Sequence, residues 1–513
     1  MGENSRIAKN TIMLYIRMLA VMAVSLYTSR IILQNLGVSD FGLYSVVGGV
    51  ATMFIFLNGA MSSVTQRYLS IEIGKNDDDQ LKKTFNVSFI IHVLIGIGVV
   101  ILCEAVGLWF IHYKMQIPEG RETAVFWTFQ ISMVMTFLSM ITVPFNALLI
   151  SRERMGVFAY ISIFDVLFKL LVAYLIASAP FDKLIYYALL MAFSQLIVLA
   201  IYVVYCKVKF VESRFCFCKF DTLYKEMVAF ASWGLLGHFS SIVTTSIQDM
   251  MLNAFFSPIV NAARGVAIRV STAVQGFSKN FQLAVEPQIT ISFAQGRIDR
   301  TFSLIDNSSR FSLYLLYFLS LPIVLCVDEI LRVWLVEVPE YTAPFIILVM
   351  LNNIIVSTAN ALNMAIRANG KIKYPEVVGG IVLILNLPLS LLFLKLGYSP
   401  LSVFIVTIFC TILAQCVRIY YAHKYIHLPV RNYITNVFVK PFLIMLVSAV
   451  IPSLISYKVS FGNDLMKILV ITICSSVSIL LFVYTLGMTH DERQLVASFI
   501  KNKLNNRHHK ISK

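Results

Sequence analysis

Long apolar runs, separated by short polar loops, dominate this sequence. A bilayer core about 30 Å thick needs roughly 20 apolar residues per helix. Fourteen runs meet that length: 11–33, 41–63, 85–111, 123–150, 157–178, 184–206, 227–253, 258–283, 308–331, 342–366, 373–396, 398–422, 437–457 and 465–488. Each is too long for a transmembrane strand of about ten residues, and lipid admits only helices or closed barrels. The sequence therefore predicts an all-α polytopic membrane protein with about 14 transmembrane helices.

The composition excludes the main alternative classes. Only 13% of the 513 residues are charged and 58% are hydrophobic, whereas a soluble domain carries about 25% charged residues. So little charge cannot cover a water-exposed surface of this size. A soluble enzyme, a disordered chain and a disulfide scaffold are excluded.

The cysteines and the N-terminus fit the same class. Most of the eight cysteines lie in apolar runs, where a thiol behaves as a small hydrophobe. Cys216 and Cys218 form a C-x-C pair in a polar loop, but no second pair or histidine is near them in sequence. We therefore expect no metal site and no cofactor. The segment 1–10 is short and polar, and no small-residue cleavage site follows the first apolar run. We therefore expect no cleaved signal peptide.

The distribution of lysine and arginine predicts the orientation. With the N-terminus placed inside, the inner segments hold 25 basic residues and the outer loops hold seven. Basic residues in short loops favour the cytoplasmic side. Both termini are therefore predicted to be cytoplasmic, and most of the formal net charge of +15 reflects topology.

The chain shows signs of an internal repeat. Gly74-Lys75-Asn76-Asp77 and Gly296-Arg297-Ile298-Asp299 follow helices at similar distances, and Arg152 and Arg367 end the fourth and tenth helices in similar basic loops. Two six-helix halves of parallel topology are typical of transporters that rock two lobes about a central site. The predicted division is a lobe at 1–206, a cytoplasmic linker at 207–226, a second lobe at 227–424, two additional helices at 425–488 and a tail at 489–513.

The tail has the pattern of an amphipathic helix. Thr489 is a suitable N-cap, and Asp491 and Glu492 suit the positive end of a helix dipole. The apolar residues that follow share one face, which indicates a helix lying on the inner membrane surface. A frayed polar tail is the alternative.

Five cations at membrane depth suggest a binding site. Ionisable residues are costly in lipid, so each is a functional hypothesis. Guanidinium groups hold phosphate oxygens with paired, charge-assisted hydrogen bonds. The predicted cationic cavity for an anionic, phosphate-bearing substrate consists of Arg17, Arg264, Arg269, Lys279 and Arg30. Arg30 and Lys279 could instead reach lipid headgroups, and Arg264 and Arg269 point about 140° apart on one helix.

Polar residues within the apolar runs extend this hypothesis. The predicted lining of the cavity includes Gln248, Asp249, Gln275, Asn58 and Gln66, which are too polar for lipid. Asp249 is expected within reach of Arg264 if their consecutive helices pack side by side.

Asp165 and Lys169 are spaced i, i+4 and can pair on one helix face. The pair is interpreted either as a coupling site or as a structural ion pair, with the structural role preferred.

One segment resembles a known family. Leu36-Gly37 followed by Phe41-Gly42-Leu43-Tyr44 resembles the opening of bacterial polysaccharide flippases in the multidrug/oligosaccharidyl-lipid/polysaccharide (MOP) exporter superfamily. The stretch from Gln248 to Gly296 is similar to the second-half counterpart. This resemblance implies a MATE-like fold and a cationic cavity between two lobes. Arg17, Arg264 and Arg269 match that cavity by helix and depth.

The resemblance also implies a function. Such flippases translocate undecaprenyl-diphosphate-linked oligosaccharide units across the bacterial cytoplasmic (inner) membrane for O-antigen, capsule or exopolysaccharide assembly. The implied partners are membrane lipid, the polyprenyl-diphosphate-linked oligosaccharide, and a polysaccharide polymerase with glycosyltransferases.

Three alternatives remain. A lipid II flippase has the same helix count, and a MATE-type drug/cation antiporter of the same superfamily would favour acidic cavity residues and twelve helices. A membrane polymerase or ligase needs catalytic groups in a large outer loop, and no outer loop here shows a nucleophile and base, so an enzyme is not expected. Nucleic-acid binding is not expected either, because the basic residues are spread over many short loops. The coupling ion, H+ or Na+, is left open.

Overall fold

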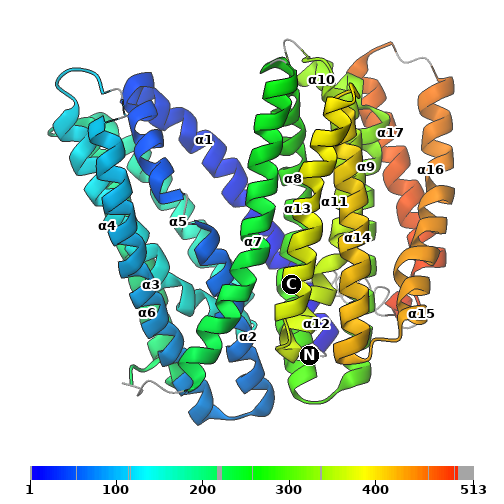
Figure 1. Cartoon of the computed structure of the whole chain (residues 1–513), viewed down its shortest axis with the longest axis horizontal. Coiled ribbons are helices and arrows are strands. Elements are labelled where there is room, and N and C mark those ends of the chain that lie inside the picture. The colour runs from blue at the N-terminus through cyan, green and yellow to red at the C-terminus, as the bar shows by residue number, and fades with distance from the viewer. Residues whose placement is uncertain are drawn as a thin grey trace, which may run out of the picture. The chain divides into compact units, whose positions relative to one another are not determined.

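The computed structural model describes residues 3–494 except 53–54, 114, 116, 217–221, 257, 336–337, 460–461 and 490–491. Every regular element in these residues is a helix (Figure 1). Within them, eleven helical segments are long and apolar enough to cross a membrane. The protein is therefore a multi-pass, all-helical membrane protein, as its apolar runs predict.

Several helices, among them α3, α7 and α8, extend beyond the matching apolar runs, and others are shorter. The first set is α1 (Glu3–Thr52), α2 (Ile55–Lys75), α3 (Asp78–Tyr113), α4 (Glu122–Ser151), α5 (Met155–Leu175), α6 (Lys183–Lys209), α7 (Thr222–Phe255) and α8 (Pro258–Ala294). The second set is α9 (Ile298–Leu325), α10 (Val327–Trp334), α11 (Thr342–Ser357), α12 (Ala359–Asn369), α13 (Lys373–Lys395), α14 (Leu401–Ile426), α15 (Val430–Tyr433), α16 (Lys440–Lys458) and α17 (Asp464–Phe482).

The first two expected helices are connected by a kink in one long helix rather than by a loop. α1 continues to Thr52 with a kink at Gly37, where φ is 80° and ψ is 166°. Glycine populates such a conformation readily because it has no Cβ. The second expected run, 41–63, is therefore divided between the end of α1 and the start of α2.

Other expected runs are broken by short irregularities. The run 342–366 is divided at Thr358 into α11 and α12. The last two runs contain π-helical turns, Ile434–Val439 before α16 and Val483–Gly487 after α17. Such turns insert an extra residue into the helix and alter its direction.

By its internal contacts, the chain forms two compact units. Unit 1 comprises Met1–Val243, Lys279–Leu304 and Asn363–Ile381, and unit 2 comprises Thr244–Ser278, Ile305–Leu362 and Val382–Lys513. These units are not the sequence halves, and the predicted division at 206 and 227 stays a prediction.

In unit 1, α1 packs on α5, and α4 packs on α2, α3 and α6. One core cluster joins side chains from α1, α2, α3, α4, α5 and α6 and includes Leu14, Leu69, Phe85, Leu148 and Tyr202. An ion-pair triad connects three segments: Arg121, next to α4, pairs with Asp40 of α1 and with Asp182, the N-cap of α6.

In unit 2, the two additional helices pack on α9. Tyr317 and Ile444 belong to one core cluster with Ile479, and the Tyr317 hydroxyl donates to the Met445 carbonyl at 2.7 Å. Two ion pairs join α10 to α17: Arg332 with Asp464 at 3.0 Å, and Lys467 with Glu329 at 2.8 Å. The additional helices are thus part of the packed unit.

The start of the tail forms the predicted cap. The Thr489 N–H donates to a Glu492 carboxylate oxygen at 2.8 Å, and the Glu492 N–H donates to the Thr489 hydroxyl at 3.4 Å, a reciprocal capping box. Arg310 of α9 forms an ion pair with Glu492. Asp491 and residues 495–513 lie outside the described residues, so the amphipathic tail helix stays a prediction.

The turns after α2 and α8 each contain one left-handed residue. These two residues do not occupy matching positions of the repeated sequence motif, which aligns Gly74 with Gly296. The left-handed residue is Asn76 (φ 56°) in the first turn and Gly296 (φ 70°) in the second. α2 and α8 lie close together at Gly74, where a Cβ atom would lie 2.9 Å from the Ala294 Cβ and 3.0 Å from the Ile291 carbonyl oxygen. This crossing therefore requires a glycine.

We expect Gly74→Ala to destabilise the protein by about 1–3 kcal/mol, because the added methyl group forces two helix backbones apart. Thermal unfolding of the purified full chain in detergent measures the effect. Gly98→Ala in α3 is the matched control, since nothing lies within 4 Å of its added Cβ and alanine favours a helix. Equal losses in the two variants would contradict this account of the crossing.

Candidate functional site

Arg264 lies at the centre of a buried polar cluster in unit 2. Its side chain is on α8 and only 4% exposed. Its Nη2 donates to the Thr245 carbonyl at 3.2 Å and to Gln248 Oε1 at 3.3 Å, both on α7. The Gln248 amide in turn donates to Asn386 Oδ1 at 2.8 Å and to Thr407 Oγ1 at 3.0 Å. α7, α8, α13 and α14 thus meet around one guanidinium group.

Sequence reasoning named Arg264 and Gln248 but missed Asn386 and Thr407. Both missed residues are polar positions within apolar runs, which is the signal that could have identified them. Asn386 is 2% exposed and also accepts from the Ser390 hydroxyl at 2.9 Å. Buried polar groups in lipid need such partners, so the cluster holds Arg264 in a defined orientation.

A second polar cluster joins α8 to α11. Gln275 Nε2 donates to Asn353 Oδ1 at 2.6 Å, and Asn353 Nδ2 donates to the Ser271 hydroxyl at 2.9 Å. Gln275 therefore lies in a helix–helix contact within unit 2. Asn353 is again a polar residue in an apolar run that the sequence analysis passed over.

Arg269 lies on a different face of α8 from Arg264. Arg269 and Thr272 are both exposed, whereas Arg264 is buried. The two arginines point apart, as helical periodicity predicts. A charged, polar face in a membrane protein suits water or a ligand better than hydrocarbon. Lys279, in unit 1, is also exposed.

Arg17 of α1 stacks on an aromatic ring. Its guanidinium carbon lies 4.5 Å from the centre of the Phe158 ring on α5, a cation–π geometry. The side chain is half-buried, and among the described residues its Nε has no hydrogen-bond partner. The side chains of Arg30 and Asp249 lie outside those that the structure describes, so their predicted roles stay predictions.

The Asp165–Lys169 pair forms on α5. Lys169 Nζ lies 2.8 Å from Asp165 Oδ2, and both side chains are partly exposed. Direct pairing on one helix face is what the i, i+4 spacing predicts.

Asn58 and Gln66 lie in contacts of α2 with α4. The Asn58 amide donates to the Ser139 hydroxyl at 3.3 Å. Gln66 is 4% exposed, and its backbone carbonyl accepts a hydrogen bond from the Ser151 hydroxyl at 3.1 Å. Here these two residues lie within the packed bundle of unit 1.

A network between the middle of α2 and the end of α12, within unit 1, was missed by the sequence analysis. The Arg67 guanidinium donates to the Arg367 carbonyl and, at 3.2 Å, to the Ala368 carbonyl. It lies 4.5 Å from the centre of the Phe230 ring. Arg367 in turn donates to the Ser63 hydroxyl at 2.8 Å and to Glu376 at 3.0 Å. Arg67 thereby satisfies carbonyl groups at a helix C-terminus, which lack partners within the helix.

A reciprocal contact joins α8 to the turn after α4, also within unit 1. Gln288 of α8 donates to the Glu153 carboxylate, which also pairs with Arg6 at 2.8 Å. Glu153 is left-handed (φ 56°), as is Gly370 (φ 89°) in the turn that Arg67 contacts. Each predicted half therefore contributes one turn that binds the second helix of the other half, a pattern expected of a repeat.

Among the described residues, no group of three or more His, Cys, Asp or Glu side chains could hold a metal ion. Cys216 is exposed and forms no disulfide bond. Cys218 lies outside the described part of the chain.

No protein-family description matches the chain, and no curated protein matches it in sequence. Solved structures do match its fold. A MATE protein in complex with MaD3S has a TM-score of 0.71 at 11% identity, covering 84% of this chain and 98% of that one. An outward-facing multidrug resistance MATE family transporter of the MOP superfamily has a TM-score of 0.69 at 12% identity, covering 82% and 96%.

A third structure comes from Pyrococcus furiosus Vc1 (DSM3638) and is described as a MOP superfamily transporter with reverse polarity of its binding pocket. It has a TM-score of 0.66 at 12% identity and covers 82% of this chain and 96% of that one. Identities this low establish the fold alone. This protein has the fold of MATE transporters of the MOP superfamily.

We expect Arg67→Gln to destabilise the protein by about 2–4 kcal/mol, because it removes charge-assisted hydrogen bonds to helix-terminal carbonyls. Arg6→Gln is the control. Arg6 also pairs across elements, but its side chain is 52% exposed, and exposed ion pairs contribute about 0–1 kcal/mol. Thermal unfolding of both purified variants measures the difference in stability. Equal losses of stability would show that the Arg67 contacts contribute no more than an exposed ion pair.

We expect the double variant Asp165→Lys/Lys169→Asp to express and function close to the wild type, because it rebuilds the ion pair in reverse. Asp165→Lys alone places two lysines side by side and should lower the yield of folded protein. Membrane yield and transport measure the outcome. A double variant with normal yield but no transport would favour a coupling role instead.

Proposed function

We propose that this protein is an exporter with a MATE-type fold whose substrate carries negative charge. The fold supports the transporter class. The substrate class rests on one observation: α8 carries Arg264, Arg269 and Lys279 but only one acidic residue, Glu286. Arg264 is buried within a polar cluster, while Arg269 is exposed on another face. Guanidinium groups bind phosphate oxygens with paired hydrogen bonds.

The more specific form of the proposal is a flippase for polyprenyl-diphosphate-linked oligosaccharides. Its diphosphate suits the exposed guanidinium group of Arg269, and the exposed Thr272 hydroxyl nearby on α8 is chemically suited to sugar hydroxyls. The sequence resemblance around Gly37 and Phe41 supports the same form. The protein would then act in the bacterial inner membrane, alongside a polysaccharide polymerase and glycosyltransferases.

A MATE-type drug/cation antiporter is the second candidate. The comparisons favour it more directly, because a similar fold belongs to a multidrug resistance transporter. A cationic drug would need acidic partners, and the Pyrococcus furiosus structure is described as a MOP transporter whose pocket polarity is reversed. Charge polarity is therefore the property that separates the two candidates.

Either form of transport would work by alternating access. The reciprocal contacts of Arg67 with the α12 end and of Gln288 with Glu153 join segments of the two predicted halves. A rocking motion of two lobes would have to break them. A transport cycle therefore predicts that these contacts are transient, with a second state in which they are absent.

We expect Arg269→Gln to lower transport of a diphosphate-linked oligosaccharide lipid by about ten- to hundredfold, the loss of one or two charge-assisted hydrogen bonds. Membrane insertion should be unchanged. The measurement is flipping of a labelled lipid-linked oligosaccharide by the purified full chain in liposomes. Arg431→Gln, an exposed arginine in a predicted inner loop, is the matched control and should transport normally.

The same liposomes, assayed with an organic cation such as ethidium, separate the candidates. Transport of the cation but not of the lipid-linked oligosaccharide would favour the antiporter. Transport of neither under an H+ or Na+ gradient would contradict the exporter proposal itself.

A further inference from the structure

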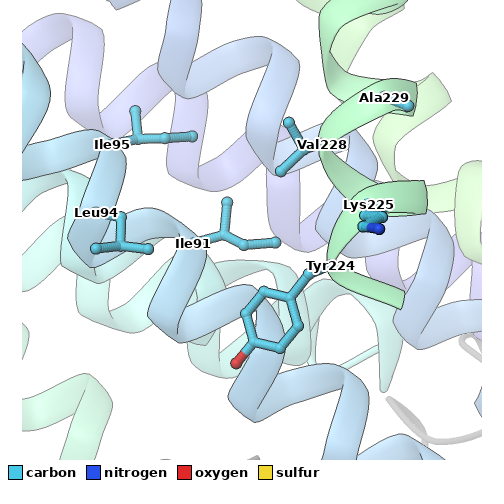
Figure 2. Close-up of a pocket in the computed structure, with 7 residues that line it drawn as sticks. All are labelled: Ile91, Leu94, Ile95, Tyr224, Lys225, Val228 and Ala229. Carbon is cyan, nitrogen blue, oxygen red and sulfur yellow. The ribbon is translucent and has the colours of Figure 1, made fainter. Parts of the chain in front are cut away.

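A lateral apolar pocket lies between α3 and α7 in unit 1. Its volume is about 470 Å³, and its lining consists of Ile91, Leu94, Ile95, Tyr224, Lys225, Val228 and Ala229. Figure 2 shows the three isoleucine and leucine side chains of α3 on one side and the α7 residues on the other. The two segments are more than a hundred residues apart in sequence, so the pocket exists only in the fold.

The pocket opens to the surface of the helix bundle. Leu94 is 52% exposed and Val228 is 46% exposed, whereas Ile91 and Tyr224 are buried. α3 is one of the helices apolar enough to span the membrane. An apolar hollow at such a surface gains by filling with hydrocarbon, since packing contacts are lost around a void. A lipid acyl chain therefore suits the pocket.

One charged residue, Lys225, lines this otherwise apolar pocket. Lys225, in the first turn of α7, is exposed and lines the pocket. It takes part in no ion pair among the described residues. A lysine can cover apolar surface with its alkyl stem while its ammonium group stays in the headgroup region. An anionic headgroup is the complement of that ammonium group.

We propose that the α3–α7 pocket binds an anionic phospholipid, with an acyl chain against Leu94 and Val228 and its phosphate at Lys225. This lipid site does not depend on the substrate proposed above. In the predicted topology it lies toward the inner leaflet, because α7 follows the cytoplasmic linker. The site adds a bound phospholipid that is distinct from the proposed substrate.

The test uses the purified full chain with phosphatidylglycerol and phosphatidylcholine of identical acyl chains. Native mass spectrometry measures how much of each lipid the protein retains. We expect about a fivefold preference for phosphatidylglycerol, the effect of one lysine near an anionic headgroup. Lys225→Gln should remove the preference, while Lys209→Gln, an exposed lysine of α6 in the predicted inner segment, should leave it intact.

A second variant tests the pocket rather than the charge. Val228→Trp fills the hollow and should lower retention of both lipids, while Ile97→Trp, a similarly exposed position of α3 outside the pocket lining, should not. Equal retention of the two lipids by the wild type, or an unchanged preference in Lys225→Gln, would overturn the proposal. Displacement of phosphatidylglycerol by an equimolar amount of a polyprenyl phosphate would also overturn it, because the pocket would then belong to an isoprenoid carrier.

Discussion

The hydrogen bonds of Arg67 to the end of α12 illustrate the constraint on which this structure depends. A helix terminus leaves carbonyl groups without partners within the helix, and a buried carbonyl group has no water to satisfy it. Arg67 supplies two donors to the Arg367 and Ala368 carbonyls and lies on the Phe230 ring. Gly370 makes the approach possible, because a Cβ there would lie 2.8 Å from the Arg67 guanidinium. One side chain thus joins two elements 300 residues apart in sequence.

The same constraint organises the polar cluster around Arg264. A cation at this depth is tolerated only with partners, and α7, α13 and α14 provide them through Thr245, Gln248, Asn386 and Thr407. The cost of burying Arg264 is thereby reduced and its orientation is fixed. The exposed Arg269, on another face of the same helix, has the freedom that Arg264 lacks.

Much of the architecture was accessible from the sequence because lipid imposes a simple rule on helix length and polarity. The apolar runs gave the class and most of the helices, and helical periodicity separated Arg264 from Arg269 correctly. The break at Gly37 falls between the first two apolar runs, as the sequence predicts. The division at Thr358 was missed, since hydrophobicity alone does not report backbone direction. Asn386, Asn353 and the Arg67 network were also missed. Their importance lies in contacts with distant helices, which no local pattern contains.

The side-chain pattern along the chain is enough to predict many membrane-spanning helices, and one of them, α8, carries three cations and one acid. Those properties follow from side-chain chemistry and from the absence of water in the bilayer, so they need no knowledge of packing. Which cation is buried, which turns bind which helices, and where a lysine borders an apolar pocket are properties of the packed fold. Each of these depends on which distant segments meet, and many polar residues of similar hydropathy could have met in other ways.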